Sequence, residues 1–164
     1  MARLAEGHAD ARAILAELSL TGYEDTPRGQ RWGVWAAVPT SVTARRIGTG
    51  WLLDGDRPWC SGAAVCTHAL VTAGAPDGPR LFAVEVRGPG MAPLEGTWPA
   101  VGMSASDSRT VRFTAVPAEP IGEPDAYVRR PGFWHGSAGV AACWYGGALG
   151  VADTLLRTRG MRPG

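Results

Sequence analysis

Short apolar runs bounded by glycine, proline and aspartate dominate residues 31–116. Such runs between turn-forming residues are typical of β-strands. The stretch from Thr110 to Val116 alternates apolar and polar residues, which predicts a strand with one buried and one wet face. The other predicted strands are Trp32 to Val38, Val42 to Ile47, Trp51 to Leu53, Ala69 to Thr72 and Leu81 to Val86. This region is therefore predicted to form a mostly-β domain.

Two tight turns are predicted within this domain. Asp54-Gly55 lies between Trp51-Leu52-Leu53 and Arg57-Pro58-Trp59, and the pair favours a hairpin because glycine adopts positive φ freely. Pro76-Asp77-Gly78 indicates a second turn, directly before the run that begins at Leu81. Both turns favour antiparallel pairing of the strands that they join.

Helical patterns flank the β-rich region. Residues Met1 to Leu18 place leucine and alanine seven positions apart, with most charges on other faces, which predicts an amphipathic helix. Ser19 to Gln30 has no period of either kind and is typical of a linker or a long loop. A second helix is predicted from about Phe133 to Arg157.

The second predicted helix contains an unbroken apolar stretch from Ala138 to Ala152. Its length raises the question of a membrane span, and Gly146 and Gly150 fit a GxxxG packing pattern. However, nothing else in the chain looks lipid-facing, and the arginines show no one-sided flank. We therefore expect no membrane span, and a helix buried in a soluble bundle or a subunit interface.

Charge and composition exclude several classes of function. The chain has 164 residues and a formal charge of +1, which does not fit a nucleic-acid-binding protein. It contains no lysine and no GxGxxG stretch, so a Schiff-base lysine, a phosphate-loop lysine and a Rossmann site are not expected. Three cysteines and the lack of a signal-like N-terminus indicate a reduced, cytoplasmic protein.

Two small clusters of reactive residues resemble known sites only superficially. Cys60, Cys66 and His68 are close in sequence, but a structural zinc site needs four ligands at paired spacing, so we expect no metal site. Ser137 lies among glycines, yet His135 stands where a nucleophile elbow needs glycine, and no predicted strand precedes it. Neither cluster predicts an activity.

Tryptophan is unusually frequent, with 7 in 164 residues, and most buried tryptophans simply belong to the core. Trp59-Cys60-Ser61-Gly62 nevertheless combines an indole face, backbone donors and a hydroxyl. Such a set suits a planar aromatic ligand such as the edge of a flavin.

Three ordered segments carry a resemblance to a known family. The segment Trp51-Leu52-Leu53-Asp54-Gly55-Asp56-Arg57-Pro58-Trp59-Cys60-Ser61-Gly62-Ala63 resembles the flavin-contacting hairpin of acyl-CoA dehydrogenases. Gly102-Met103-Ser104-Ala105-Ser106-Asp107-Ser108-Arg109-Thr110-Val111-Arg112-Phe113 is similar to the family's "G-M-x-x-S-D-T/S-R-x-V-x-F" strand, and Val116-Pro117 follows it as in many members. Arg130-Pro131-Gly132-Phe133 then leads into the glycine- and alanine-rich helix.

The resemblance implies an α+β fold, with a mostly antiparallel β-barrel-like domain between an N-terminal and a C-terminal helix. It divides the chain into the end of a first helical domain with its linker (1–30), a middle β-domain (31–132) and the first helix of a truncated C-terminal domain (133–164). In the family, FAD lies between the β-domain and the C-terminal helices. The expected partners are an acyl-CoA substrate and either a homo-oligomer or a helical partner subunit.

The resemblance also assigns residues to the flavin site. Trp59 and Ser61 match the tryptophan and the threonine or serine that contact the flavin, and Ala36 and Ala37 fall at two further contact positions. Ala37 replaces the threonine of the family's "T-E-P" sequence and Val38 replaces its glutamate, so a side-chain hydrogen bond to the flavin is lost.

No catalytic residue is predicted, because the family's general base is missing. The position of the glutamate in the C-terminal helix matches Val140, Ala141 stands where many members have arginine, and residues 127–152 contain no Asp or Glu. We therefore expect an acyl-CoA dehydrogenase-like flavoprotein that is incomplete and inactive as a single chain. The alternative is a non-catalytic β-domain that acts as an interaction or acyl-ligand-binding module.

Overall fold

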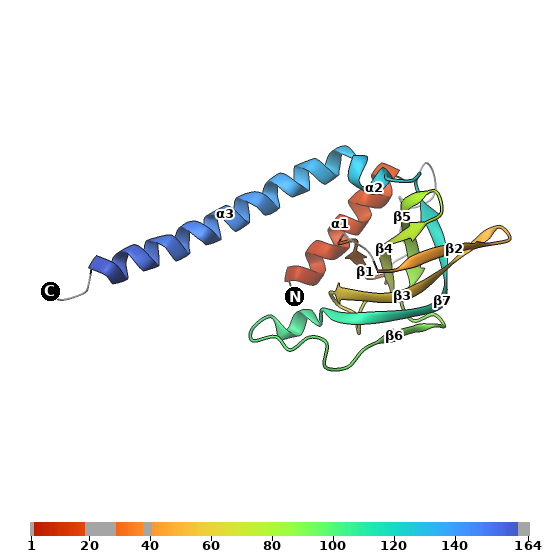
Figure 1. Ribbon diagram of the computed structural model, residues 1–164, viewed down its shortest axis with the longest axis horizontal. Helices are drawn as coiled ribbons and strands as arrows, with labels where there is room; N and C mark the ends of the chain where they lie inside the picture. Colours follow the sequence, from red (N-terminus) through yellow and green to blue (C-terminus); the bar gives the residue numbers. More distant parts are fainter. Residues whose placement is uncertain (1, 19–28, 38–40, 161–164) are drawn as a thin grey trace. The chain divides into compact units, whose positions relative to one another are not determined.

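The computed structural model describes residues 2–18, 29–37 and 41–160 (Figure 1). They divide into two units, Met1–Arg129 and Arg130–Gly164. The first unit holds every described strand, and the second consists mainly of one long helix. Residues 19–28 of the predicted linker, which runs from Ser19 to Gln30, and residues 38–40 lie outside the described part of the chain.

The first unit is built on a closed five-stranded mixed β-barrel with the strand order β4-β2-β3-β7-β5, where β5 pairs back to β4. Two more strands extend it: β1 pairs parallel with β4, and β6 pairs antiparallel with β7. The predicted α+β fold with a mostly antiparallel barrel is confirmed. The strands are β1 (Trp32–Trp35), β2 (Thr43–Ile47), β3 (Gly50–Cys60), β4 (His68–Ala75), β5 (Gly78–Glu85), β6 (Met91–Pro93) and β7 (Arg109–Ile121).

One of the two predicted turns is confirmed and the other is wrong. Ala75 pairs with Gly78, so Pro76 and Asp77 form the tight turn between β4 and β5. Asp54-Gly55 forms no turn, because β3 continues through it. The hairpin that precedes β3 instead turns at residues 48 and 49, where Ile47 pairs with Gly50.

Asp54 and Gly55 form an irregularity within β3 rather than its end. The register between β3 and β7 shifts between Leu53 and Gly55, and Gly55 has φ +125°. The Asp54 carboxylate accepts a hydrogen bond of 2.8 Å from the backbone N–H of Ala115 on β7. A bulge of this kind needs the same residue types as a turn, which explains why the sequence of this pair predicts a turn.

The strands also differ from the prediction in their bounds, and one strand is additional. β1 ends at Trp35, so Ala36 and Ala37 lie beyond the strand. β7 continues to Ile121, well past Val116. The glycine- and proline-rich crossing from Gly88 to Met103 contains the short strand β6.

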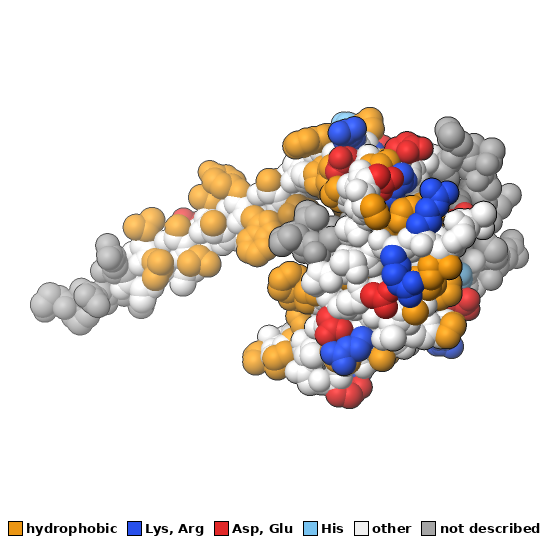
Figure 2. All heavy atoms as spheres, turned by 45° about the vertical axis from the view of Figure 1, so that its right-hand side comes forward, with side chains coloured by type: hydrophobic (Ala, Val, Ile, Leu, Met, Phe, Trp, Pro, Cys, Tyr) orange, Lys and Arg blue, Asp and Glu red, His pale blue; other side chains and the backbone are white. Residues whose placement is uncertain are grey.

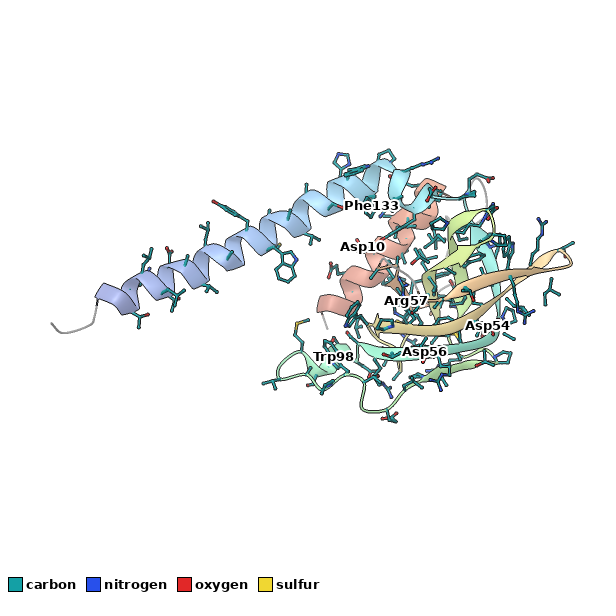
Figure 3. The ribbon with its side chains drawn as sticks, viewed as in Figure 1. Asp10, Asp54, Asp56, Arg57, Trp98 and Phe133 are labelled. Atoms are coloured by element: carbon teal, nitrogen blue, oxygen red, sulfur yellow. The ribbon has the colours of Figure 1, made fainter. Side chains whose placement is uncertain are left out.

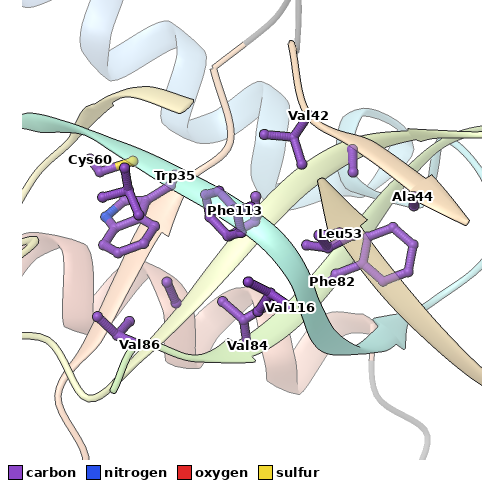
Figure 4. Close-up of a cluster of buried hydrophobic side chains, with 14 of the residues drawn as sticks. Trp35, Val42, Ala44, Leu53, Cys60, Phe82, Val84, Val86, Phe113 and Val116 are labelled. Atoms are coloured by element: carbon purple, nitrogen blue, oxygen red, sulfur yellow. The ribbon is translucent and has the colours of Figure 1, made fainter. Parts of the chain in front are cut away.

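Two apolar clusters hold the first unit together. The larger cluster fills the barrel and includes Trp35, Leu53, Phe82 and Phe113 (Figure 4). The second lies where α1 (Ala2–Leu18) packs on the sheet, and its helical members are Ala11, Ile14 and Leu15. The predicted amphipathic helix is thus confirmed, with its apolar face against the barrel.

The second unit is described by itself. The short helix α2 (Ala126–Arg129) ends the first unit, and α3 (Pro131–Gly160) follows it. The side chains from Trp134 to Thr158 are exposed, and Figure 2 shows hydrophobic ones spaced along the helix. The helix is predicted to be buried, but the described residues of this chain do not cover these side chains. None of the described helices is long and apolar enough to cross a membrane.

Two carboxylates on β3 are held by groups on neighbouring strands. The N–H of Ala115 and the guanidinium of Arg45 lower the pKa of Asp54. The guanidinium of Arg112, which donates two hydrogen bonds of 2.8 Å to Asp56, lowers the pKa of that carboxyl. Both carboxylates link β3 to neighbouring strands in their charged form, so their protonation weakens the barrel.

We predict that the free energy of unfolding falls as the pH drops below about 4. A carboxyl whose pKa is lower in the folded state stabilises the protein above its unfolded pKa of about 4, and this contribution is lost as the pH falls through the folded pKa. Urea unfolding between pH 7 and pH 3 measures the effect. Asp54→Asn should lose less stability over this range than the wild type, and equal losses would contradict the prediction.

Candidate functional site

The candidate site lies at the end of β3, where a second irregularity reverses the side-chain alternation. Arg57 and Cys60 are both buried, and the register with β7 shifts between them. In a regular strand Trp59 would lie inside, two residues after Arg57, and Cys60 outside. The shift instead leaves the Trp59 side chain 67% exposed and buries Cys60 completely.

The backbone of Trp59 is strained at this position. Its φ of 60° is in the left-handed region, which is a genuine outlier for a bulky residue. Such strain costs on the order of 1–3 kcal/mol and clusters at ligand sites and active sites. The exposed indole presents a flat apolar surface, and the assignment of Trp59 to a flavin site stays a prediction.

The loop after Trp59 is fixed by hydrogen bonds to the residues before β7. The N–H of Gly62 donates to the carbonyl of Ser106 at 2.7 Å, and the N–H of Ala63 donates to the carbonyl of Asp107 at 3.3 Å. The carboxylate of Asp107 accepts a third bond from the N–H of Ala64 at 2.9 Å. These bonds join the two sequence segments that resemble the family, although more than 40 residues separate them.

Ser61 connects the end of β3 to the end of β1. The indole N–H of Trp35 donates to the backbone carbonyl of Ser61 at 3.0 Å, which brings Ala36 and Ala37 close to the candidate site along the chain. Ala37 is exposed, whereas the methyl group of Ala36 packs into the cluster beneath α1. Of these four predicted residues, Trp59, Ser61 and Ala37 keep accessible surface, and Ala36 offers only its backbone.

Arg57 is a residue of this region to which the sequence assigned no role. Its side chain is 1% exposed, and Nη2 donates to the hydroxyl of Thr72 at 2.9 Å and to the carbonyl of Ala37 (Figure 3). Burial lowers the pKa of the guanidinium. The buried Arg57 guanidinium therefore links the chain beyond β1 to β4. An arginine in a strand is usually solvated, so sequence carried no signal for this role.

The cysteines and His68 have structural roles. Burial raises the pKa of the Cys60 thiol to about 12 and also raises that of Cys66, so neither is a ready thiolate. The imidazole of His68 stacks on Trp32 at a centroid distance of 4.8 Å. Among the residues that the structure describes, no group of three or more His, Cys, Asp or Glu could hold a metal ion.

The helix α3 holds the residues that were compared with a nucleophile elbow and with a general base. The hydroxyl of Ser137 donates to the carbonyl of Phe133 at 2.7 Å, one helical turn earlier, so this hydrogen bond lies within α3. Val140 and Ala141 are exposed on the same helix. The first carboxylate along α3 is Asp153.

No family model and no curated protein sequence matches this chain, but solved structures do. A variant of the steroid ACAD (acyl-CoA dehydrogenase) Tcur3481-Tcur3483 is 28% identical with a TM-score of 0.56, over 68% of this chain and 33% of that one. Dibenzothiophene monooxygenase TdsC from Paenibacillus sp. A11-2 is 25% identical with a TM-score of 0.58, over 72% and 34%. Methanesulfinate monooxygenase MsuC from Pseudomonas fluorescens is 22% identical with a TM-score of 0.59, over 71% and 32%.

This chain spans about a third of the length of each of these structures. The matched part has a common fold, and the steroid ACAD belongs to the family that the sequence segments around Trp59 and Ser106 resemble. The resemblance is confirmed by structure at this level. Over the part that matches, the chain therefore has the fold of the steroid ACAD, a protein of the family that its sequence segments resemble.

Proposed function

We propose that the barrel is the flavin-binding β-domain of an FAD-dependent, acyl-CoA dehydrogenase-like flavoprotein. The observation that carries the proposal is Trp59, an exposed indole held at a strained backbone position beside the hydroxyl of Ser61. Flavin binding in this fold has a precedent, since TdsC has been solved with FMN bound.

The residues present fit the ring system of a flavin. The indole of Trp59 offers a flat apolar surface, and the Ser61 hydroxyl offers a donor or an acceptor for the polar edge of the ring. The backbone of Ala36 and Ala37 supplies further polar groups, and the buried Arg57 donates a hydrogen bond to the carbonyl of Ala37. Bound FAD would supply the two-electron chemistry, while these residues bind and orient the ring.

The proposed reaction is the removal of two hydrogens from the α and β carbons of an acyl-CoA thioester. It needs a positioned general base, which is commonly worth about 10²–10⁴-fold in rate. Residues 127–152 contain no Asp or Glu in any copy of this chain, so we assign the base to a helical partner subunit. The remainder of the FAD site is assigned to that subunit or to a second copy. The similar steroid ACAD carries a paired name, Tcur3481-Tcur3483, which suits a two-component arrangement.

A non-catalytic binding module is the second candidate. The observation that favours it is the replacement of polar family residues by Ala37, Val38 and Val140, which removes a flavin hydrogen bond and the base together. On this alternative the barrel keeps its architecture and binds an acyl ligand or another protein. The two candidates differ in whether flavin binds to the chain.

The visible absorption spectrum of the purified chain, recorded before and after addition of excess FAD and removal of unbound flavin, separates these candidates. We expect a retained flavin band close to one FAD per chain. The same measurement after mixing with a helical partner tests whether that partner completes the site. A chain that retains no flavin under either condition would contradict the proposed function and favour the binding module.

A further inference from the structure

Three serine hydroxyls form a continuous chain that leads inward from the candidate site. Ser61 Oγ lies 2.8 Å from Ser108 Oγ, which lies 2.9 Å from Ser106 Oγ, and both distances are normal for O–H···O hydrogen bonds. Ser108 and Ser106 are buried, with 6% and 7% of their surface exposed, while Ser61 is half-buried. The outer hydroxyl is thus coupled to two inner ones that have little contact with solvent.

A chain of hydroxyls can be polarised in either direction. Each serine has one O–H donor and two acceptor lone pairs, and either atom of each pair here could be the donor. If Ser106 donates to Ser108 and Ser108 to Ser61, the proton of Ser61 is free to point outward. If Ser61 donates to Ser108 and Ser108 to Ser106, then Ser61 presents only lone pairs to a ligand.

A flavin ring reverses its hydrogen-bonding role when it is reduced. Its N5 atom carries no hydrogen in the oxidised state and accepts a hydrogen bond, whereas after two-electron reduction N5 carries a hydrogen and donates one. A hydroxyl with fixed polarity would favour one redox state and lose its bond in the other.

We propose that the Ser61–Ser108–Ser106 chain lets Ser61 donate to the oxidised flavin and accept from the reduced flavin. This inference rests on the proposed function. Ser61 is the residue that touches the ring, and Ser108 and Ser106 are positioning residues that act through it. The reversal changes two hydrogen bonds together, without movement of the backbone.

Substitutions at the inner end of the hydroxyl chain, Ser106, and at its middle member, Ser108, should have different effects. When the hydroxyl chain is polarised outward, Ser106 acts only as a donor. When it is polarised inward, Ser106 is the acceptor for the O–H of Ser108. In Ser106→Ala, inward polarisation leaves the O–H of Ser108 buried without an acceptor, which penalises only the reduced state. Ser108→Ala instead cuts Ser61 off in both states, so it should weaken both by a similar factor.

The test is the midpoint potential of bound FAD, measured by dithionite titration with a reference dye, together with the Kd of oxidised FAD. Ser106→Ala should leave the Kd of oxidised FAD unchanged and weaken binding of the reduced form about tenfold, which lowers the midpoint potential of a two-electron couple by about 30 mV. Ser106→Thr keeps the hydroxyl and should restore the wild-type potential. The matched control is Ser104→Ala, an exposed hydroxyl in the same short helix, η1 (Ser104–Ser106), which should have no effect.

Three other results would overturn the inference. An unchanged potential in Ser106→Ala would show that Ser61 does not reverse its polarity through the chain. Equal weakening of both redox forms in Ser106→Ala would indicate a merely structural role. If wild-type protein binds no FAD with or without a partner, the proposed function itself fails, and that outcome differs from retained flavin with an unaltered potential.

Discussion

Trp59→Ala should weaken FAD binding by about 1–3 kcal/mol, or roughly 5- to 150-fold in Kd. The reason is that the indole contributes little to the packing of the described structure, since it is 67% exposed and its backbone is strained at φ 60°. Loss of an aromatic surface that lies against a ligand costs affinity, whereas loss of a side chain with little burial costs little stability. Titration of flavin fluorescence measures the first quantity and urea unfolding the second.

Two variants make this experiment specific. Trp59→Phe keeps an aromatic face and should retain most of the affinity. Ile47→Ala removes another exposed apolar side chain, 51% accessible at the turn before β3, and should leave FAD binding unchanged. An unchanged Kd in Trp59→Ala would remove Trp59 from the site, and a matching loss of folding stability would mean that the indole supports the fold instead.

The candidate site is predicted from one local segment of the sequence, and the structure adds contacts that no local segment can contain. Trp59 and Ser61 lie within one resembling stretch, so their proximity was predictable. The hydroxyl pair of Ser61 and Ser108 joins residues 47 positions apart, and it depends on the pairing of β3 with β7. The same limit applies to Arg57, whose hydrogen-bond partners come from β4 and from the chain beyond β1.

Most strands were predictable because alternation and apolar runs follow directly from the two faces of a sheet. Closure of the barrel was not predictable in this way, because it rests on the pairing of β4 with β5 and of β5 with β7. The exposure of Trp59 was not predictable either. The register shift after Arg57 reverses the alternation of buried and exposed side chains that a regular strand would continue. Irregularities, rather than regular strands, therefore shape the candidate site.

The largest loss of stability is expected for Gly55→Ala, at the first irregularity of β3. Gly55 has φ +125°, a conformation that residues with a Cβ rarely adopt. An added Cβ would lie 2.5 Å from the carbonyl oxygen of Ser41 and 3.2 Å from the Cα of Val42, and backbone atoms cannot move aside as a flexible side chain can. Backbone strain of about 1–3 kcal/mol and overpacking of about 1–3 kcal/mol together give a loss of about 2–6 kcal/mol.

The control for this variant is Gly96→Ala, because Gly96 also has positive φ, +71°, but an added Cβ would meet no atom within 4 Å. It should cost only the strain of a left-handed alanine, about 1–2 kcal/mol. Urea unfolding of both variants separates the two effects, since a loss at Gly55 no larger than that at Gly96 would mean that Ser41 and Val42 move away easily. The larger loss is expected because Ser41 is itself fixed to β3, where its hydroxyl donates to the carbonyl of Asp56. Glycine is therefore required at position 55 because residues 41 and 42 pass close to β3 there. It is not required for the hairpin turn that an Asp-Gly pair usually forms.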